Sequence, residues 1–258
     1  QQSGDLPPDA LVRDVPTRSP GFPPKNFDQG YSGAVAASSA LSQSLNIPAV
    51  KMLQKYTPGK FLEILKVLGF TTFSHDADYY GLSLILGGGE TSLWELSGAY
   101  ASLSRVLTRY NSEKRYCRED YHMPLLQNKS EEEKEISEDL SPPLSASSIW
   151  LTYEALKKVN RPEGESGWQY FSSSSDIAWK TGTSFGFRDA WAVGTTPSYV
   201  IGVWAGNADG EGRPGLTGIS AAAPILFDLV NMMGSEGWFS TPSEDLTIIK
   251  VCSLSGFR

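Results

Sequence analysis

The chain has 258 residues, 40% of them hydrophobic, and a formal net charge of −7 at pH 7. This length is enough to bury one large core or two small ones. The acidic balance argues against a nucleic-acid surface, which needs a basic patch, and no apolar run is long enough to cross a bilayer. The two histidines and the widely separated Cys117 and Cys252 point to no metal site or cofactor, and they leave a disulfide open.

The first third of the chain is predicted to be mostly helical. Residues 3–33 are rich in proline, glycine and aspartate, which predicts an extended surface segment with short strands at most. A short helix is expected over residues 38–45, and a second one is expected after Pro48. Pro58 opens a third helix, whose apolar residues recur at helical spacing up to a capping glycine, Gly69.

The middle of the chain combines helices with polar segments. Residues 87–89 are three glycines, which we interpret as a tight turn before a helix over 90–107, because the lysine of a phosphate-binding loop is missing. Residues 109–141 are dense in charge and predict an exposed excursion, perhaps better described as a hairpin with a mobile tip. A helix over 145–159 and a loop over 161–175 follow.

Strands dominate the last third. Residues 177–183, 190–196 and 199–205 are strand candidates with short links, which predict antiparallel neighbours. An apolar helix over 221–233 has Pro224 in its first turn. The fold class is therefore α+β, with helices covering at least one face of an antiparallel sheet. We expect one domain over residues 1–240, and the start of a linker or following region over 241–258.

The strongest chemical signal lies on the first of these strands. Lys180, Thr181 and Gly182 form a Lys-Thr-Gly sequence, which Thr183 and Ser184 follow. A lysine on a strand edge attracts a carboxylate, hydroxyl groups donate hydrogen bonds to it, and a glycine lets the backbone approach a substrate. An edge strand also accepts a peptide as a further strand. Lys-Thr-Gly is one of three signatures of serine enzymes that react with penicillin, so these residues are candidates for the lysine and substrate-binding side of such a site.

A second signature has a weaker match. Ser44, Leu45 and Asn46 form a Ser-x-Asn sequence between two predicted helices, and this pattern alone is common. Taken singly, Ser44 is equally well a helix residue and Asn46 a helix stop. Lys180 alone is equally well a solvated edge-strand lysine that discourages aggregation.

Longer stretches resemble one known family. Residues 179–194 are similar to the transpeptidase domain of class A penicillin-binding proteins, in particular the penicillin-binding protein 1C branch. Further similar stretches lie at residues 44–50, 82–100 and 203–218. The resemblance implies the penicillin-recognising serine-transferase fold, in which a five-stranded antiparallel sheet lies between helical layers and the site lies at the sheet edge.

The resemblance also implies a reaction and roles. A serine would attack the penultimate D-Ala carbonyl of a peptidoglycan stem peptide, and β-lactams would acylate the same serine. Ser44 would relay a proton, Asn46 would orient the acyl side chain, and Lys180 would hold Ser44 and set the local potential. Thr181 and Thr183 would bind the substrate carboxylate, and the backbone N–H of Thr183 would form half of the oxyanion hole.

The signature of the nucleophile is missing. No Ser-x-x-Lys occurs in the 258 residues, and the first residues resemble sequence shortly after the helix that carries it in the family. We therefore expect an N-terminally truncated transpeptidase domain, whose parent protein has a membrane anchor and a glycosyltransferase domain and acts at the periplasmic face of a bacterial inner membrane.

Two alternatives stay open. A non-catalytic binding or scaffolding module of the same fold is the second interpretation. A β-lactamase or other serine hydrolase is the third, and it is the weakest because no glutamate lies in a convincing setting for a deacylating base.

Overall fold

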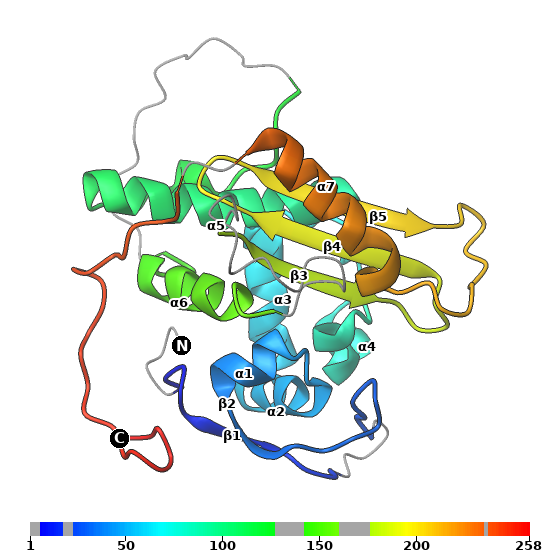
Figure 1. Ribbon diagram of the computed structural model, residues 1–258, viewed down its shortest axis with the longest axis horizontal. Coiled ribbons are helices and arrows are strands. Elements are labelled where there is room, and N and C mark those ends of the chain that lie inside the picture. Colours follow the sequence, from blue (N-terminus) through cyan, green and yellow to red (C-terminus); the bar gives the residue numbers. More distant parts are fainter. Residues whose placement is uncertain (1–5, 18–22, 127–141, 160–175, 235–236) are drawn as a thin grey trace.

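The computed structural model describes residues 6–17, 23–126, 142–159, 176–234 and 237–258. Its elements form an α+β fold, with a sheet between helical layers and a smaller helical region beside it (Figure 1). No helix in these residues is long and apolar enough to cross a membrane.

The N-terminal residues form a small sheet of their own. Strand β1 (Leu11–Asp14) pairs antiparallel with β2 (Gly33–Ala36), so that Leu11 lies opposite Ala36. The expectation of short strands within 3–33 is therefore confirmed. Helix α1 (Ala37–Ser42) follows β2 directly, and both strands contact it.

Local signals explain the helices that follow. Pro58 begins α3, the side chain of Thr57 accepts a hydrogen bond from Lys60 N, and Gly69 has the positive φ of 95° that a helix-ending glycine adopts. The hydroxyl of Ser92 caps the longest helix in the same way. The elements in order are α2 (Asn46–Tyr56), α3 (Pro58–Val67), α4 (Ala77–Tyr80), η1 (Gly81–Leu86), α5 (Leu93–Glu113), η2 (Arg118–Asp120) and α6 (Ala146–Leu156).

The main sheet has the predicted antiparallel strands. Its order is β3 (Ala178–Thr183), β4 (Asp189–Thr195) and β5 (Val200–Gly206). After it, the π-helical turn η4 (Gly218–Ala222) leads into α7 (Ala223–Met233).

Side chains of β3 alternate between two cores. Trp179 is fully buried against Phe227 of α7, with ring centroids 4.9 Å apart. Its neighbour Ala178 lies in the other core, with Val106 of α5 and Ile149 of α6. This period of two places α7 on one face of the sheet and α5 and α6 on the other (Figure 1).

The strand number corrects one expectation. The resemblance implied a five-stranded sheet, whereas the described residues form a three-stranded sheet and a separate two-stranded one. Strands β1 and β2 do not extend the main sheet because they pair with each other and pack against α1, and β1 also contacts α2.

The charged excursion also begins later than expected. Helix α5 continues to Glu113, and Tyr110, Cys117 and Asp120 are buried. Residues 109–126 therefore pack against the fold instead of forming an exposed hairpin. The predicted tip at 127–141 and the predicted loop at 161–175 lie outside the described residues. Cys117 is buried, Cys252 is exposed, and both thiols are free.

The C-terminal residues return to the start of the chain. Leu11 N donates to Ser255 O at 2.9 Å, and Gly256 lies against the backbone of Asp9. Assignment of residues 241–258 to a linker stays a prediction.

Candidate active site

Lys180 joins two parts of the chain that are 136 residues apart. Its Nζ donates to Ser44 Oγ at 2.6 Å and to the backbone oxygen of Thr181 at 2.7 Å. The lysine is half-buried on β3, while Ser44 comes from the connection between α1 and α2. The structure thus brings together two residues that the sequence offered only as parts of separate motifs.

Burial changes the proton affinity of Lys180. Removing an ammonium group from water disfavours its charged form, and this lowers the pKa of Lys180 to about 8 from its ordinary value of 10.5. An amine with a pKa near neutrality can both give and take a proton at physiological pH. The hydroxyl of Ser44 lies beside it, so the pair has the composition of a proton relay.

Ser44 has an unusual backbone conformation. Its φ is 58°, in the left-handed region that residues other than glycine seldom adopt. Backbone hydrogen bonds from Ser44 N to Leu41 O and from Leu45 N to Ala40 O hold this turn, at 3.0 and 2.9 Å. The turn leaves Ser44 exposed, with its hydroxyl against Lys180. Strained residues of this kind concentrate at functional sites.

Asn46 begins α2 and is held by a segment that the sequence did not single out. Its backbone N–H donates to Asn26 Oδ1 at 2.9 Å, and its Nδ2 donates to the backbone oxygen of Lys25 at 2.8 Å. Within the described residues its Oδ1 has no partner, so this oxygen is available to accept a hydrogen bond from a ligand. Asn26 acts as the cap of α2, because its Oδ1 also accepts from Ile47 N at 3.4 Å.

A buried carboxylate supports this cap. Asp14 is 0% exposed, and both of its oxygens accept from Asn26 Nδ2, at 2.8 and 3.0 Å. Oδ2 of Asp14 also accepts from Ser32 N at 2.7 Å. Asp14 and Asn26 are residues that sequence reasoning missed. Their segment was predicted to be surface chain, and no local pattern links them to Asn46.

The outer edge of β3 presents backbone groups. Ser184 N donates to Asp189 O at 3.0 Å, so this pair exchanges hydrogen bonds across β3 and β4. Antiparallel pairs alternate, so the backbone groups of Thr181 and Thr183 point away from β4. Strand β3 has no other partner strand among the described residues. The N–H of Thr183 is therefore free to donate to a bound group.

The hydroxyl groups after Lys180 differ in their structural use. Thr183 Oγ1 accepts from Gly218 N at 3.0 Å, and Ser184 Oγ accepts from Asp189 N at 2.8 Å. The hydroxyl of Thr181 has no partner in the part of the chain that the structure describes. A carboxylate only accepts hydrogen bonds, so the O–H groups of all three residues remain usable for it.

Glycines bring the backbone close on this strand. A Cβ at Gly182 would meet only Trp191 Cβ, at 3.6 Å, which is an ordinary contact. The protein's own packing therefore does not require a glycine there, and the exposed space over it stays open to a substrate. Gly218 is different, because its Cβ would lie 2.5 Å from Trp191 O and 2.6 Å from Gly182 O.

An aromatic contact links the two sides of the site. Phe27 and Phe187 meet edge to face, with ring centroids 6.4 Å apart. Phe27 follows the capping Asn26, and Phe187 lies in the turn between β3 and β4. This contact ties the segment that holds Asn46 to the turn at the end of β3.

The comparisons with known proteins identify the family. No family model matches the chain. Penicillin-binding protein 1C of Escherichia coli (strain K12) is 33% identical over 233 residues, which are 90% of this chain and 28% of that protein. The chain is homologous to class A penicillin-binding proteins. Penicillin-binding protein 1A of Neisseria cinerea is 28% identical over 247 residues, 88% of this chain and 29% of that protein. The chain thus spans less than a third of the length of these curated relatives.

Solved structures agree on the fold. Penicillin-binding protein 1A from Haemophilus influenzae has a TM-score of 0.66 at 21% identity, over 93% of this chain and 42% of that one. The PonA1 protein from Mycobacterium tuberculosis in complex with penicillin V has a TM-score of 0.68 at 18% identity, over 99% of this chain and 70% of that one. The chain therefore has the transpeptidase-domain fold of penicillin-binding proteins.

Proposed function

We propose that this chain supplies the proton relay and the carboxylate-binding wall of a D,D-transpeptidase domain that cross-links peptidoglycan stem peptides. The contact of 2.6 Å between Lys180 Nζ and Ser44 Oγ carries this proposal. It joins two signatures of penicillin-reactive serine enzymes across the chain, and the homology to penicillin-binding proteins supports the same chemistry.

The relay acts on the leaving amine. In the proposed reaction a serine oxygen attacks the carbonyl carbon of the penultimate D-Ala, an ester forms, and the bond to the terminal D-Ala breaks. Ser44 passes its proton to the nitrogen of the departing D-Ala and takes a proton from Lys180 Nζ. An amine of a neighbouring stem peptide then attacks the ester, and its proton returns along the same path as the serine is released.

The remaining groups position the substrate. The hydroxyls of Thr181 and Thr183, together with the charge of Lys180, bind the carboxylate of the terminal D-Ala or of a β-lactam. The outward N–H of Thr183 donates to the developing oxyanion. The free Oδ1 of Asn46 accepts from an amide of the acyl side chain. Gly182 and Ser184 line the same strand, where the substrate backbone adds to the edge of β3.

The attacking serine is the missing part. No Ser-x-x-Lys occurs in these residues, and the chain matches only 28% of the length of the Escherichia coli relative. The proposal therefore assigns the nucleophile, a membrane anchor and a glycosyltransferase domain to a longer protein at the periplasmic face of the inner membrane. The same missing motif favours a second candidate function, a binding module of this fold without catalysis.

Intact-mass measurement after incubation with a penicillin tests the proposal. The longer protein should gain the mass of one penicillin, and the 258-residue chain should gain none. In the longer protein, Lys180→Met should slow acylation about 100-fold, whereas Lys158→Met, at an exposed lysine after α6, should not. An unmodified longer protein would favour the binding module, and a modified 258-residue chain would show that the nucleophile lies within it.

A further inference from the structure

A groove that shares no residue with the Lys180 site lies between α5 and the turn that joins β4 to β5. Its volume is about 550 Å³, and its walls are one face of α5 and residues 196–200. Most of the lining side chains are polar, with serines and threonines on both walls and two arginines, Arg105 and Arg109, on α5.

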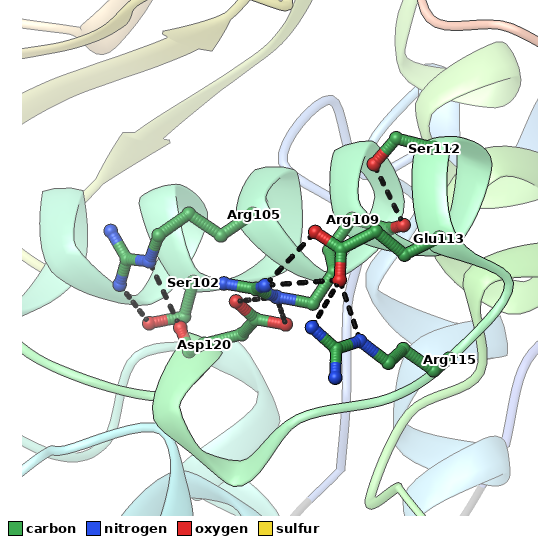
Figure 2. Close-up of polar contacts among 7 residues, drawn as sticks. All are labelled: Ser102, Arg105, Arg109, Ser112, Glu113, Arg115 and Asp120. Atoms are coloured by element: carbon green, nitrogen blue, oxygen red, sulfur yellow. Dashed lines mark hydrogen bonds and ion pairs between the residues drawn. The ribbon is translucent and has the colours of Figure 1, made fainter. Parts of the chain in front are cut away.

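Arg105 is held firmly but lacks a carboxylate partner. Its Nε donates to the backbone oxygen of Asp120 at 3.0 Å, and its Nη2 donates to Ser102 Oγ at 2.9 Å and to the backbone oxygen of His122. Its Nη1 has no partner within the described residues, and it points away from Ser102 and Asp120 (Figure 2). Partial burial lowers the pKa of Arg105, and the charge of Asp120 opposes this only in part.

The nearby carboxylates are already paired with other guanidinium groups. Both oxygens of Asp120 accept from Arg109 Nε, at 2.9 and 3.1 Å. Glu113 binds Arg109 Nη1 at 3.2 Å and also binds Arg115 (Figure 2). The cluster therefore has three guanidinium groups and two carboxylates, and Arg105 is the one cation whose direct partners are all neutral.

The shape of the groove suits an extended chain better than a single ion. From Ser97 to Ser112 it follows fifteen residues of α5, about 22 Å at the rise of an α-helix. This is the length of about seven residues in extended conformation. The hydroxyls of Ser97, Thr108 and Ser198 have no hydrogen-bond partner in the described part of the chain, so they are available to peptide amides.

The edge of the sheet adds backbone groups to this groove. Val200, the first residue of β5, lines it. On the side away from β4, β5 has no partner strand among the described residues. A bound segment can therefore make main-chain hydrogen bonds there as well as side-chain contacts to α5.

We propose that this groove binds an extended peptide segment of about seven residues, with a carboxylate that pairs with Nη1 of Arg105. A guanidinium and a carboxylate form strong, directional hydrogen bonds, and the free hydroxyls supply the sequence-independent part. The inference does not rest on the proposed transpeptidase function, because no residue of the Lys180 site lines the groove.

Fluorescence anisotropy with labelled peptide pools tests it on the 258-residue chain. The probes are random heptapeptides, acetylated and amidated at their ends, with either Glu or Gln at the central position. The Glu pool should bind about tenfold more tightly than the Gln pool, the effect expected of one charge-assisted pair. Equal binding of the two pools would overturn the proposal.

Three variants locate the effect. Arg105→Gln should remove the preference for Glu, whereas Arg115→Gln, which changes the charge equally outside the groove lining, should keep it. Thr108→Trp fills the groove from an exposed position and should abolish binding of both pools while circular dichroism stays unchanged. If Arg115→Gln weakens binding as much as Arg105→Gln, the attraction is diffuse and the assignment to Arg105 is wrong.

Two further outcomes would name a different occupant. If inorganic phosphate binds as tightly as the Glu pool and displaces it, the groove is a simple anion site and the peptide assignment is wrong. If neither pool binds and sedimentation velocity shows a dimer that Arg105→Gln dissociates, the occupant is a second copy of this chain.

Discussion

The β3 side of the Lys180 site is held by a backbone ladder, whereas the Ser44–Asn46 side is held by buried side chains. On β3, Lys180 to Thr183 take their places from the pairing with β4, and neighbouring residues along the chain supply that pairing. On the other side, Asn46 depends on Asn26 and on Asp14, which lies in another strand. Backbone order is therefore robust to single side-chain changes, and the side-chain network is not. The predictions below exploit that difference.

Asp14→Ala should have the largest effect. It leaves Asn26 Nδ2 and Ser32 N without their buried acceptor, which should lower the free energy of unfolding by about 4 kcal/mol. Urea denaturation measures this change. Asp9→Ala, at an exposed aspartate in the same segment, is the matched control and should change stability by less than about 0.5 kcal/mol. Equal effects of the two variants would remove the buried network from the account.

Asn26→Ala should act on one side of the site only. It removes the cap of α2 and leaves the Asp14 carboxylate without its main donor, at a cost of about 3 kcal/mol. Amide hydrogen exchange should speed up at Asn46 and Ile47 before it changes at β3. Asn207→Ala, which breaks one exposed hydrogen bond to Glu211 O, should leave both regions unchanged. Uniform acceleration over the chain would show that the two sides are not independent.

Gly218→Ala should disturb the β3 side instead. A Cβ there meets the backbone oxygens of Trp191 and Gly182 at 2.5 and 2.6 Å, and backbone atoms cannot move aside as a flexible side chain can. We expect a loss of about 2 kcal/mol, with exchange increased at β3 and not at α2. Gly59→Ala lies in α3, where a Cβ meets nothing nearer than 4.0 Å, and it should be neutral or stabilising.

Lys180 should make stability depend on pH in the alkaline range. Its pKa is lowered to about 8 in the folded chain from 10.5, so between these values the unfolded state binds more protons and stability rises with pH. Because the side chain is only half-buried, we expect about 1.5 kcal/mol between pH 8 and 10.5 relative to Lys180→Met. Lys158→Met should give the same pH profile as the wild type. A wild-type profile parallel to that of Lys180→Met would contradict the lowered pKa.

The parts of the fold that the sequence predicts are those with local causes. The start of α3 at Pro58, its glycine cap and the antiparallel order of β3 to β5 all follow from neighbouring residues. The Lys-Thr-Gly motif was found for the same reason. The Asp14–Asn26 network was missed because it forms between residues 12 positions apart in a segment without periodicity. The left-handed turn at Ser44 and the extension of α5 to Glu113 depend on tertiary contacts that no short window contains.

The ionisation of Lys180 is the most direct test of the central claim, that a buried lysine joins the two sides of the site at Ser44. NMR titration of the lysine side chains, with Lys180 assigned by the Lys180→Met variant, gives its midpoint in the folded chain. The structure predicts a midpoint of about 8. A midpoint near 10.5 would mean that Lys180 is a solvated edge-strand lysine, and the site built around it would not exist.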